Sequence, residues 1–322
     1  MDRGMSVSLW CEEVEEDQSL DRAQTELRAP AQGHTGGSAQ LRAAWDPTVS
    51  GQRVIQRLLH VEERYMPSML YITLVQRDPQ QREELAKWAL EVCCECGCDE
   101  AVFPLSVSLL DRFLSASLVL PVSPYCLTAA CILIASKLTE CENVTADTLC
   151  AAAEYSFLPS NLREMERLIL ASLRWDTAAV TPQDFLPHFL AAVEERAAAG
   201  ERDAAPAELL STLRRHSDTL AAMCVCDSRF LGAPPSLVAA ASLNSALRGL
   251  SDGGSGQLAA MSEALAELCQ ADLTVLQCHS EMVEFALRQR LRCGLPQGPA
   301  EKDAEVEAER AGTPTDMTEI DF

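Results

Sequence analysis

Positive charge is scarce in this chain. Across 322 residues, 26 lysines and arginines stand against 48 aspartates and glutamates, a formal net charge of −22. Binding to nucleic-acid phosphates depends on clustered Lys and Arg. The sequence therefore predicts no direct contact with nucleic acid, which counts against a DNA-binding role, and it favours a basic protein partner.

Long apolar runs and the usual motifs of catalysis are missing as well. No apolar stretch approaches the roughly 18 residues of a membrane span, and the first residues lack the basic start and apolar centre of a signal peptide. The five histidines form no His-Glu-x-x-His pattern, and no Gly-x-Gly-x-x-Gly or phosphate loop occurs. We expect a soluble protein of the nucleus and cytoplasm with no membrane partner, no catalytic residue and no cofactor.

Cysteine, by contrast, is abundant, with 14 residues. Many cysteines lie inside helical apolar patterns, where a free thiol behaves as a small hydrophobe, as a reducing compartment allows. A denser group stands at the end of one predicted helix and consists of Cys93, Cys94, Cys96 and Cys98. The paired Cys-x-x-Cys knuckles and spacer of a strong zinc sequence are missing. The pattern therefore favours a thiol-rich helix end over a metal site.

The chain divides into a helical body and two tails. Residues 1–44 and 293–322 are acidic or rich in Gly, Gln, Ser and Pro without sustained periodicity, which predicts disorder. In the body, apolar residues recur at helical spacing, and no strand pattern of useful length occurs. The helices we expect span residues 50–65, 79–96, 102–117, 124–138, 145–153, 159–173, 182–199, 206–226, 235–249, 257–269 and 272–292.

Two of these helices are alike. The helices from Pro124 and Pro235 each begin with proline and carry alanines where neighbouring helices must approach closely, which predicts a duplicated bundle with this helix at its centre. The 50–65 helix has an apolar face that packs on either bundle or on a partner, and the sequence does not divide these roles. That face consists of Val54, Leu58, Leu59 and Val61.

The 124–138 helix is small or apolar on every face until Lys137 at its exit. A lysine there is favoured by the helix dipole, but its ammonium must stay solvated or meet a carboxylate, because burying it unpaired costs several kcal/mol. Lys137 is therefore a cap or a partner contact. About twenty residues earlier, residues 110–114 read Leu-Asp-Arg-Phe-Leu.

These two stretches resemble the cyclin box, in which a Leu-Asp-Arg-Phe-Leu helix precedes a central helix ending Ala-Ser-Lys. The resemblance runs from about Trp45 to Leu291 and is most specific for the D-type G1 cyclins, of which this chain looks like a divergent member. The D-type matches stand at residues 88, 90–93, 102–105, 173–175, 181–185 and 234–236.

The resemblance implies an all-α fold of two tandem five-helix cyclin boxes, at residues 45–176 and 177–292, plus an N-terminal helix and disordered acidic tails. It implies a regulatory subunit that binds and activates a G1 cyclin-dependent kinase, with Cip/Kip-type inhibitors as further partners. Lys137 and Glu166 are similar in position to the cyclin lysine and glutamate that hold the kinase's regulatory helix. The plain structural alternative is an internal ion pair.

A substrate-docking groove is also implied, in the degenerate form Gln81, Glu84, Leu85, Trp88 and Glu91. Cyclins that recruit Arg-x-Leu peptides have apolar residues where this chain has Gln81 and Glu84. Without these two apolar side chains, burial of the peptide's leucine contributes less to the binding free energy, by about 1 kcal/mol or more. We therefore expect feeble docking, with Trp88 mostly in the core.

The tails carry two short motifs. Leu9, Cys11 and Glu13 form a Leu-x-Cys-x-Glu match that an extended strand presents on one side, and D-type cyclins use this motif to bind retinoblastoma-type pocket proteins. Thr313 and Thr315 lie in Thr-Pro-Thr-Asp, which resembles the D-type phospho-degron. Phosphorylated Thr313 would then be read by a ubiquitin ligase. The rival hypothesis is a kinase-independent scaffold for pocket proteins or transcription factors.

Overall fold

The computed structural model of the chain describes residues 51–118, 121, 123–200, 207–250 and 255–294. Over these ranges the chain is helical and contains no strand, so the all-α prediction is confirmed. None of the described helices is long and apolar enough to cross a membrane. The tail motifs with Leu9, Cys11, Glu13, Thr313 and Thr315 lie outside the described residues.

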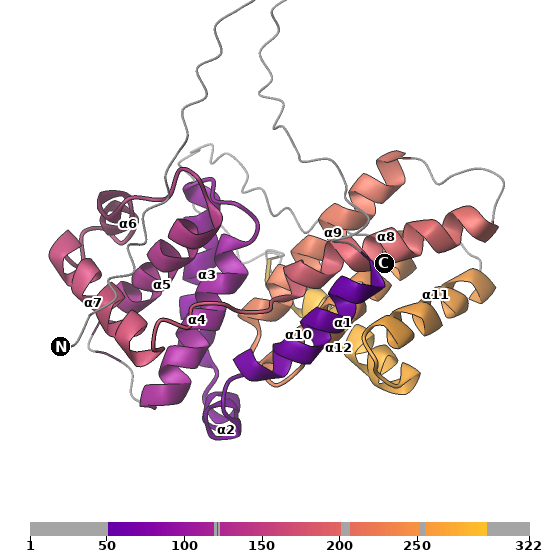
Figure 1. Cartoon of the computed structure of the whole chain (residues 1–322), viewed down its shortest axis with the longest axis horizontal. Helices are drawn as coiled ribbons and strands as arrows, with labels where there is room; N and C mark the ends of the chain where they lie inside the picture. The colour runs from indigo at the N-terminus through magenta and orange to yellow at the C-terminus, as the bar shows by residue number, and fades with distance from the viewer. Residues whose placement is uncertain (1–50, 119–120, 122, 201–206, 251–254, 295–322) are drawn as a thin grey trace, which may run out of the picture. The chain divides into compact units, whose positions relative to one another are not determined.

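The first bundle is built around α5 (Figure 1). Helix α5 packs against α3, α4, α6 and α7, and its residues from Cys126 to Ser136 are all buried, as expected of a helix that is small or apolar on every face. The helices of this bundle are α2 (Met69–Arg77), α3 (Gln80–Glu95), α4 (Val102–Ser117), α5 (Pro124–Thr139), α6 (Ala146–Ala152) and α7 (Pro159–Ser172).

The second bundle repeats this design around α10. Helix α10 packs against α8, α9, α11 and α12, and its buried alanines allow the neighbouring helices to approach closely. The helices are α8 (Pro182–Gly200), α9 (Ala207–Cys226), α10 (Pro235–Leu250), α11 (Ser255–Leu268) and α12 (Leu273–Gly294), with the short 3-10 helix η3 (Ser228–Phe230) after α9. The predicted pair of tandem bundles is therefore confirmed.

Helix α1 (Gln52–Glu62) belongs to the second bundle although it comes first in the chain. It packs on α8 and α10, and its Ile55 is only 1% exposed in the core of the second bundle. The buried carboxylate of Glu62 accepts the backbone N–H (2.9 Å) and the hydroxyl (2.8 Å) of Ser236 in the first turn of α10. Leu58, Leu59 and Val61 are partly buried against the same core, so of the two bundles it is the second on which this face packs.

Helix α2 was not predicted. It begins after Ser68, whose hydroxyl accepts the N–H of Tyr71 (3.3 Å), and it ends before Pro79. Its Met69, Leu70 and Leu74 are exposed, so its apolar residues do not form the single stripe by which amphipathic helices are recognised.

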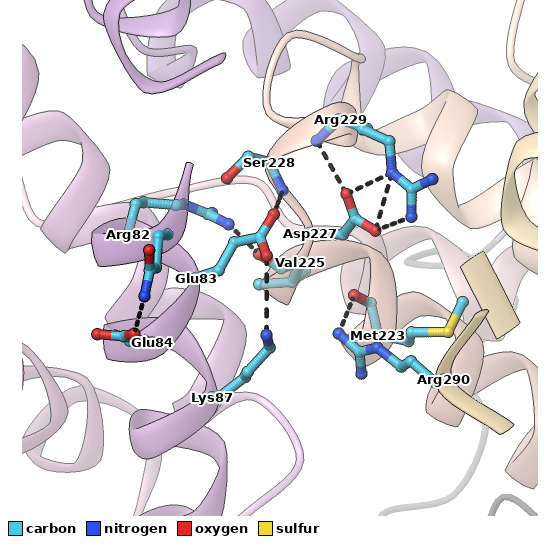
Figure 2. A network of polar contacts seen from close by, with 11 residues as sticks. Arg82, Glu83, Glu84, Lys87, Met223, Val225, Asp227, Ser228, Arg229 and Arg290 are labelled. Atoms are coloured by element: carbon cyan, nitrogen blue, oxygen red, sulfur yellow. Dashed lines mark hydrogen bonds and ion pairs between the residues drawn. The ribbon is translucent and has the colours of Figure 1, made fainter. Parts of the chain in front are cut away.

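A buried ion pair joins three helices of the first bundle and reaches the second. Arg82 on α3 makes a two-pronged contact with Asp111 on α4 (3.1 and 2.8 Å), and Tyr71 on α2 donates to the same carboxylate (2.8 Å). Burial acts to lower the pKa of Arg82, but the adjacent Asp111 charge raises it overall. The remaining guanidinium nitrogen donates to the carbonyl oxygen of Val225 on α9 (2.7 Å), as Figure 2 shows.

The neighbour of Arg82 makes a second contact between the bundles. Glu83 accepts the backbone N–H of Ser228, the first residue of η3, at 3.1 Å, and its other oxygen lies 3.7 Å from the ammonium of Lys87 (Figure 2). Two successive residues of α3 therefore contact the end of α9 and the start of η3.

A pH-dependent contact lies at another point between the bundles. Arg214 on α9 lies 3.5 Å from Glu100, in the turn before α4, and 3.7 Å from Asp218. Burial, together with the charge of Glu100, raises the pKa of Asp218 from 3.8 to about 6, and Arg214 offsets only part of the increase. Folding therefore favours the protonated carboxyl, and this stabilisation is lost as the pH rises through 6.

We predict that Asp218→Asn stabilises the protein relative to the natural chain above about pH 7, by roughly 1–3 kcal/mol. The gain should shrink as the pH falls and Asp218 takes up its proton. Urea denaturation at about pH 5 and pH 8 measures the difference, with Glu95→Gln, on an exposed carboxylate, as control. An equal effect of Asp218→Asn at both pH values would contradict the assignment.

Candidate functional site

Lys137 and Glu166 meet at the surface of the first bundle. Lys137 lies in the last turn of α5, and its ammonium donates to the Glu166 carboxylate on α7 at 2.5 Å. The lysine side chain is 43% exposed and the glutamate 15%. The structure therefore contains the internal ion pair that was the structural alternative for these residues, and a partner can reach the pair from solvent.

The exit of α5 is held in place by a polar cluster. Ser136 donates its hydroxyl to Glu140 at the end of the helix and accepts the N–H of Val144 (2.8 Å). Glu140 also accepts the N–H of Asp99 from the turn before α4 (2.8 Å). These bonds hold the backbone on both sides of Lys137, from which its side chain projects.

Exposed apolar side chains occur on the helices that carry the pair and near their ends. Large apolar residues that face solvent in one region are unusual for a closed surface and mark contact sites. Leu138 (54% exposed) follows Lys137 directly, and the other exposed side chains lie on α7 or near its ends: Tyr155 (72%), Leu158 (63%), Leu168 (50%) and Trp175 (74%). Leu138 therefore adds exposed apolar area next to the charged pair, a combination that suits a protein partner.

A cleft of about 360 Å³ lies next to this surface. It is lined by the starts of α4 and α8, the end of α5 and the linker between the bundles, and includes Leu105, Leu138, Ala178 and Ala179. Arg112 on α4 shapes it by donating to the carbonyl oxygens of Asp176 and Ala178, both at 2.7 Å. The Leu-Asp-Arg-Phe-Leu stretch thus supplies Asp111 to the core and Arg112 to the linker.

The residues of the implied docking groove take different positions. Leu85 is in the core at 2% exposed, whereas Gln81, Glu84 and Glu91 face solvent. Glu84 accepts a hydrogen bond from Gln80 (3.0 Å). Trp88 is partly buried against the first core and meets the ring of Tyr125 edge-on, with centroids 5.2 Å apart. The exposed ring of Tyr125 on α5 therefore lies against Trp88, on the helix that carries Gln81 and Glu84.

The cysteine group closes α3. Cys93 is buried, and Cys94, Cys96 and Cys98 are partly buried. Within the described ranges, no three His, Cys, Asp or Glu side chains gather in a way that could hold a metal ion.

Sequence reasoning missed several residues of these surfaces. Leu138 and Trp175 are exposed rather than buried, and Tyr125 faces Trp88 from a different helix. The signal for Leu138 was its place directly after Lys137, beyond the buried part of the helix. Nothing local marks Tyr125, since its partner lies 37 positions earlier.

Comparison with known proteins gives two family matches in tandem. Residues 53–178 match the cyclin N-terminal domain and residues 180–293 match the cyclin C-terminal domain. The X-ray structure of a viral cyclin from herpesvirus saimiri has a TM-score of 0.59 over 74% of this chain and 97% of its own, with 24% identity. That similarity shows the cyclin fold.

Similar proteins of known name indicate which type of cyclin the chain resembles. The G1/S-specific cyclin-D2 of Mus musculus is 36% identical over 287 residues, which cover 87% of this chain and 96% of the relative. The G1/S-specific cyclin-D3 of Homo sapiens is 36% identical over 291 residues, with 87% and 95% covered. The G1/S-specific cyclin-D1 of Danio rerio is 35% identical over 287 residues. The chain therefore belongs to the cyclins, and among them to the D-type, so that it is a regulatory subunit of a cyclin-dependent kinase and not itself an enzyme.

Proposed function

We propose that this cyclin activates a G1-type cyclin-dependent kinase through the surface around Lys137 and Glu166 and thereby promotes the G1/S transition. The carrying observation is the solvent-accessible ion pair on α5 and α7, with exposed Leu138 and Trp175 and a cleft beside it. Each side chain of the pair has hydrogen-bonding capacity left, since an ammonium has three donors and a carboxylate about four acceptor positions. The pair can therefore bind backbone groups of a partner helix.

Activation would come from binding alone. The surface would hold the kinase's regulatory helix in the position at which the kinase's own Lys–Glu pair forms and its activation segment opens. The cyclin supplies no catalytic group to this step. It shifts the kinase toward its active state because it binds that state more tightly than the inactive one.

The tails would direct and time this activity. Leu9, Cys11 and Glu13 would dock retinoblastoma-type pocket proteins as substrates of the complex. Phosphorylated Thr313, with Thr315 beside it, would create a site for a ubiquitin ligase and set the lifetime of the protein. Cip/Kip-type inhibitors are expected partners of the assembled complex, which would act in the nucleus and cytoplasm.

The proposal is tested by reconstitution. The full chain is mixed with a purified G1-type cyclin-dependent kinase, and phosphorylation of a pocket-protein fragment is compared with that by kinase alone. Activation is expected, and Cys11→Ala should weaken phosphorylation of the pocket protein without weakening binding to the kinase. Absence of any complex with the kinase would overturn the proposal and leave the kinase-independent scaffold as the better reading.

The altered groove gives a separate prediction. Replacing Gln81 by Met and Glu84 by Ile restores two apolar walls on the exposed face of α3. Each wall buries part of a leucine side chain, so the double variant should bind an Arg-x-Leu peptide roughly ten- to thirtyfold more tightly than the natural chain. Fluorescence anisotropy with a labelled peptide measures the dissociation constant. Lys87→Met, on the same helix, is the control, and an affinity raised equally by that variant would refute the assignment.

A further inference from the structure

The C-terminal end of α3 brings two cysteines together through its backbone. The chain reverses at Gly97, whose φ of 65° lies in the left-handed region. The N–H of Gly97 donates to the carbonyl of Cys94 (3.2 Å), and the N–H of Cys98 donates to the carbonyl of Cys93 (2.9 Å). These bonds form a Schellman motif, which places the side chain of the residue after the glycine against the helix residue five positions earlier. Here both residues are cysteines.

The two thiols differ in environment. Cys93 is 4% exposed within the first core, whereas Cys98 is only partly buried. The hydrogen bond between the two sulfurs lowers the pKa of the Cys98 thiol, against the effect of burial, and the same bond together with burial raises the pKa of Cys93. Because the thiolate is the reactive form of cysteine, Cys98 is the accessible nucleophile and Cys93 is the neighbouring thiol that can respond.

The other two cysteines of the group lack these features. Burial raises the pKa of both Cys94 and Cys96, so neither thiol is activated. Disulfides join residues whose Cα atoms lie roughly 4.4–6.8 Å apart, and the bond from the Cys98 N–H to the carbonyl of Cys93 holds these two residues close although they lie five positions apart in the sequence.

We propose that Cys98 and Cys93 form a reversible disulfide when the protein meets a hydroperoxide. The Cys98 thiolate attacks one oxygen of hydrogen peroxide, the O–O bond breaks, and the hydroxide released becomes water by taking up the proton that the thiol had lost. This step leaves Cys98 as a sulfenic acid. The Cys93 sulfur then attacks the Cys98 sulfur, the S–O bond breaks, and a second water leaves with the Cys93 proton.

The electrons balance, because the two thiols lose two electrons and the peroxide gains them. Glutathione, a thiol reductant, reverses the reaction by thiol–disulfide exchange, which returns both cysteines to thiols. Disulfides of proteins in reducing compartments are mostly of this transient, redox-sensing kind. The pair is a modification site in the turn after α3, one residue before Asp99, whose N–H binds Glu140 at the end of α5.

The test is peptide mapping of the full chain. The protein is treated with hydrogen peroxide at equal concentration, free thiols are alkylated, and a protease that cleaves after glutamate is added. Cleavage after Glu95 separates Cys93 from Cys98, so a bond between them joins two peptides that otherwise part. We expect this linked pair by mass spectrometry and its disappearance after glutathione.

Serine variants identify the bonded sulfurs. Cys98→Ser should lower the yield of linked peptide by roughly tenfold or more, whereas Cys94→Ser and Cys96→Ser should change it less than about twofold, since only Cys98 is the activated thiol. In Cys93→Ser, Cys98 should stay a sulfenic acid that dimedone traps. Circular dichroism verifies that each variant folds. Absence of the linked peptide in the natural chain, or an equal loss in Cys94→Ser or Cys96→Ser, would overturn the proposal.

Discussion

Arg82→Met is expected to destabilise the protein by roughly 3–5 kcal/mol, because it leaves the Asp111 carboxylate buried without a counter-charge. The side chains of Arg82 and Asp111 are each only 6% exposed, so water cannot replace the lost partner. The variant also removes the hydrogen bond to Val225, which joins the two bundles. The midpoint of thermal unfolding should fall on the order of 10 °C, as measured by calorimetry.

Two comparisons separate this effect from a general loss of arginine. Arg64→Met removes an ion pair of similar length, 2.7 Å to Asp176, but Arg64 is 68% exposed. It should cost much less than Arg82→Met, as the loss of an exposed pair does. Adding Asp111→Asn to Arg82→Met removes the unpaired charge and should recover part of the loss. Equal destabilisation by Arg64→Met and Arg82→Met would show that burial of the pair is not the cause.

The helices themselves could be predicted closely where local signals mark their ends. The expected helix 102–117 coincides with α4, and the prolines at 124, 159 and 235 mark the starts of α5, α7 and α10. Helix α2 was not predicted, because Met69 and Leu74 are apolar but exposed and so interrupt the pattern of a single apolar stripe. A buried central helix is easier to predict than a short surface helix. It is apolar on every face, so its prediction does not depend on finding a single apolar stripe at helical spacing.

Contacts between the bundles could not be predicted. The acceptor for Arg82 is a backbone carbonyl at Val225, 143 positions away, and any residue type could have supplied it. Glu83 likewise binds a backbone N–H of η3. The pairing of Lys137 with Glu166 was within reach because both are charged residues beside apolar faces of helices expected to pack together. The sequence therefore shows which charged side chains need a partner. It does not show which backbone carbonyl or N–H group will be that partner.

Lys137→Glu should weaken kinase binding and activation by roughly thirtyfold or more, the loss expected when one partner of a buried interfacial charge contact is removed. The free cyclin should still fold, because Lys137 is 43% exposed, but it should be less stable, since the new carboxylate faces that of Glu166, which is 15% exposed. Calorimetry of the variant and titration of kinase activity measure the two effects separately.

The charge swap Lys137→Glu with Glu166→Lys decides between the two roles of this pair. It keeps an ion pair between α5 and α7, so a purely internal role predicts normal activation of the kinase and a melting temperature close to that of the natural chain. A role in contacting the kinase predicts the opposite outcome for activity, since both charges now face the partner with the wrong sign while the fold stays intact. We expect the swapped protein to fold, to keep binding pocket proteins through its arm, and to fail to activate the kinase. Normal activation by the swap would assign the pair to the cyclin's own packing and transfer the kinase contact to the cleft lined by Leu138 and Ala178.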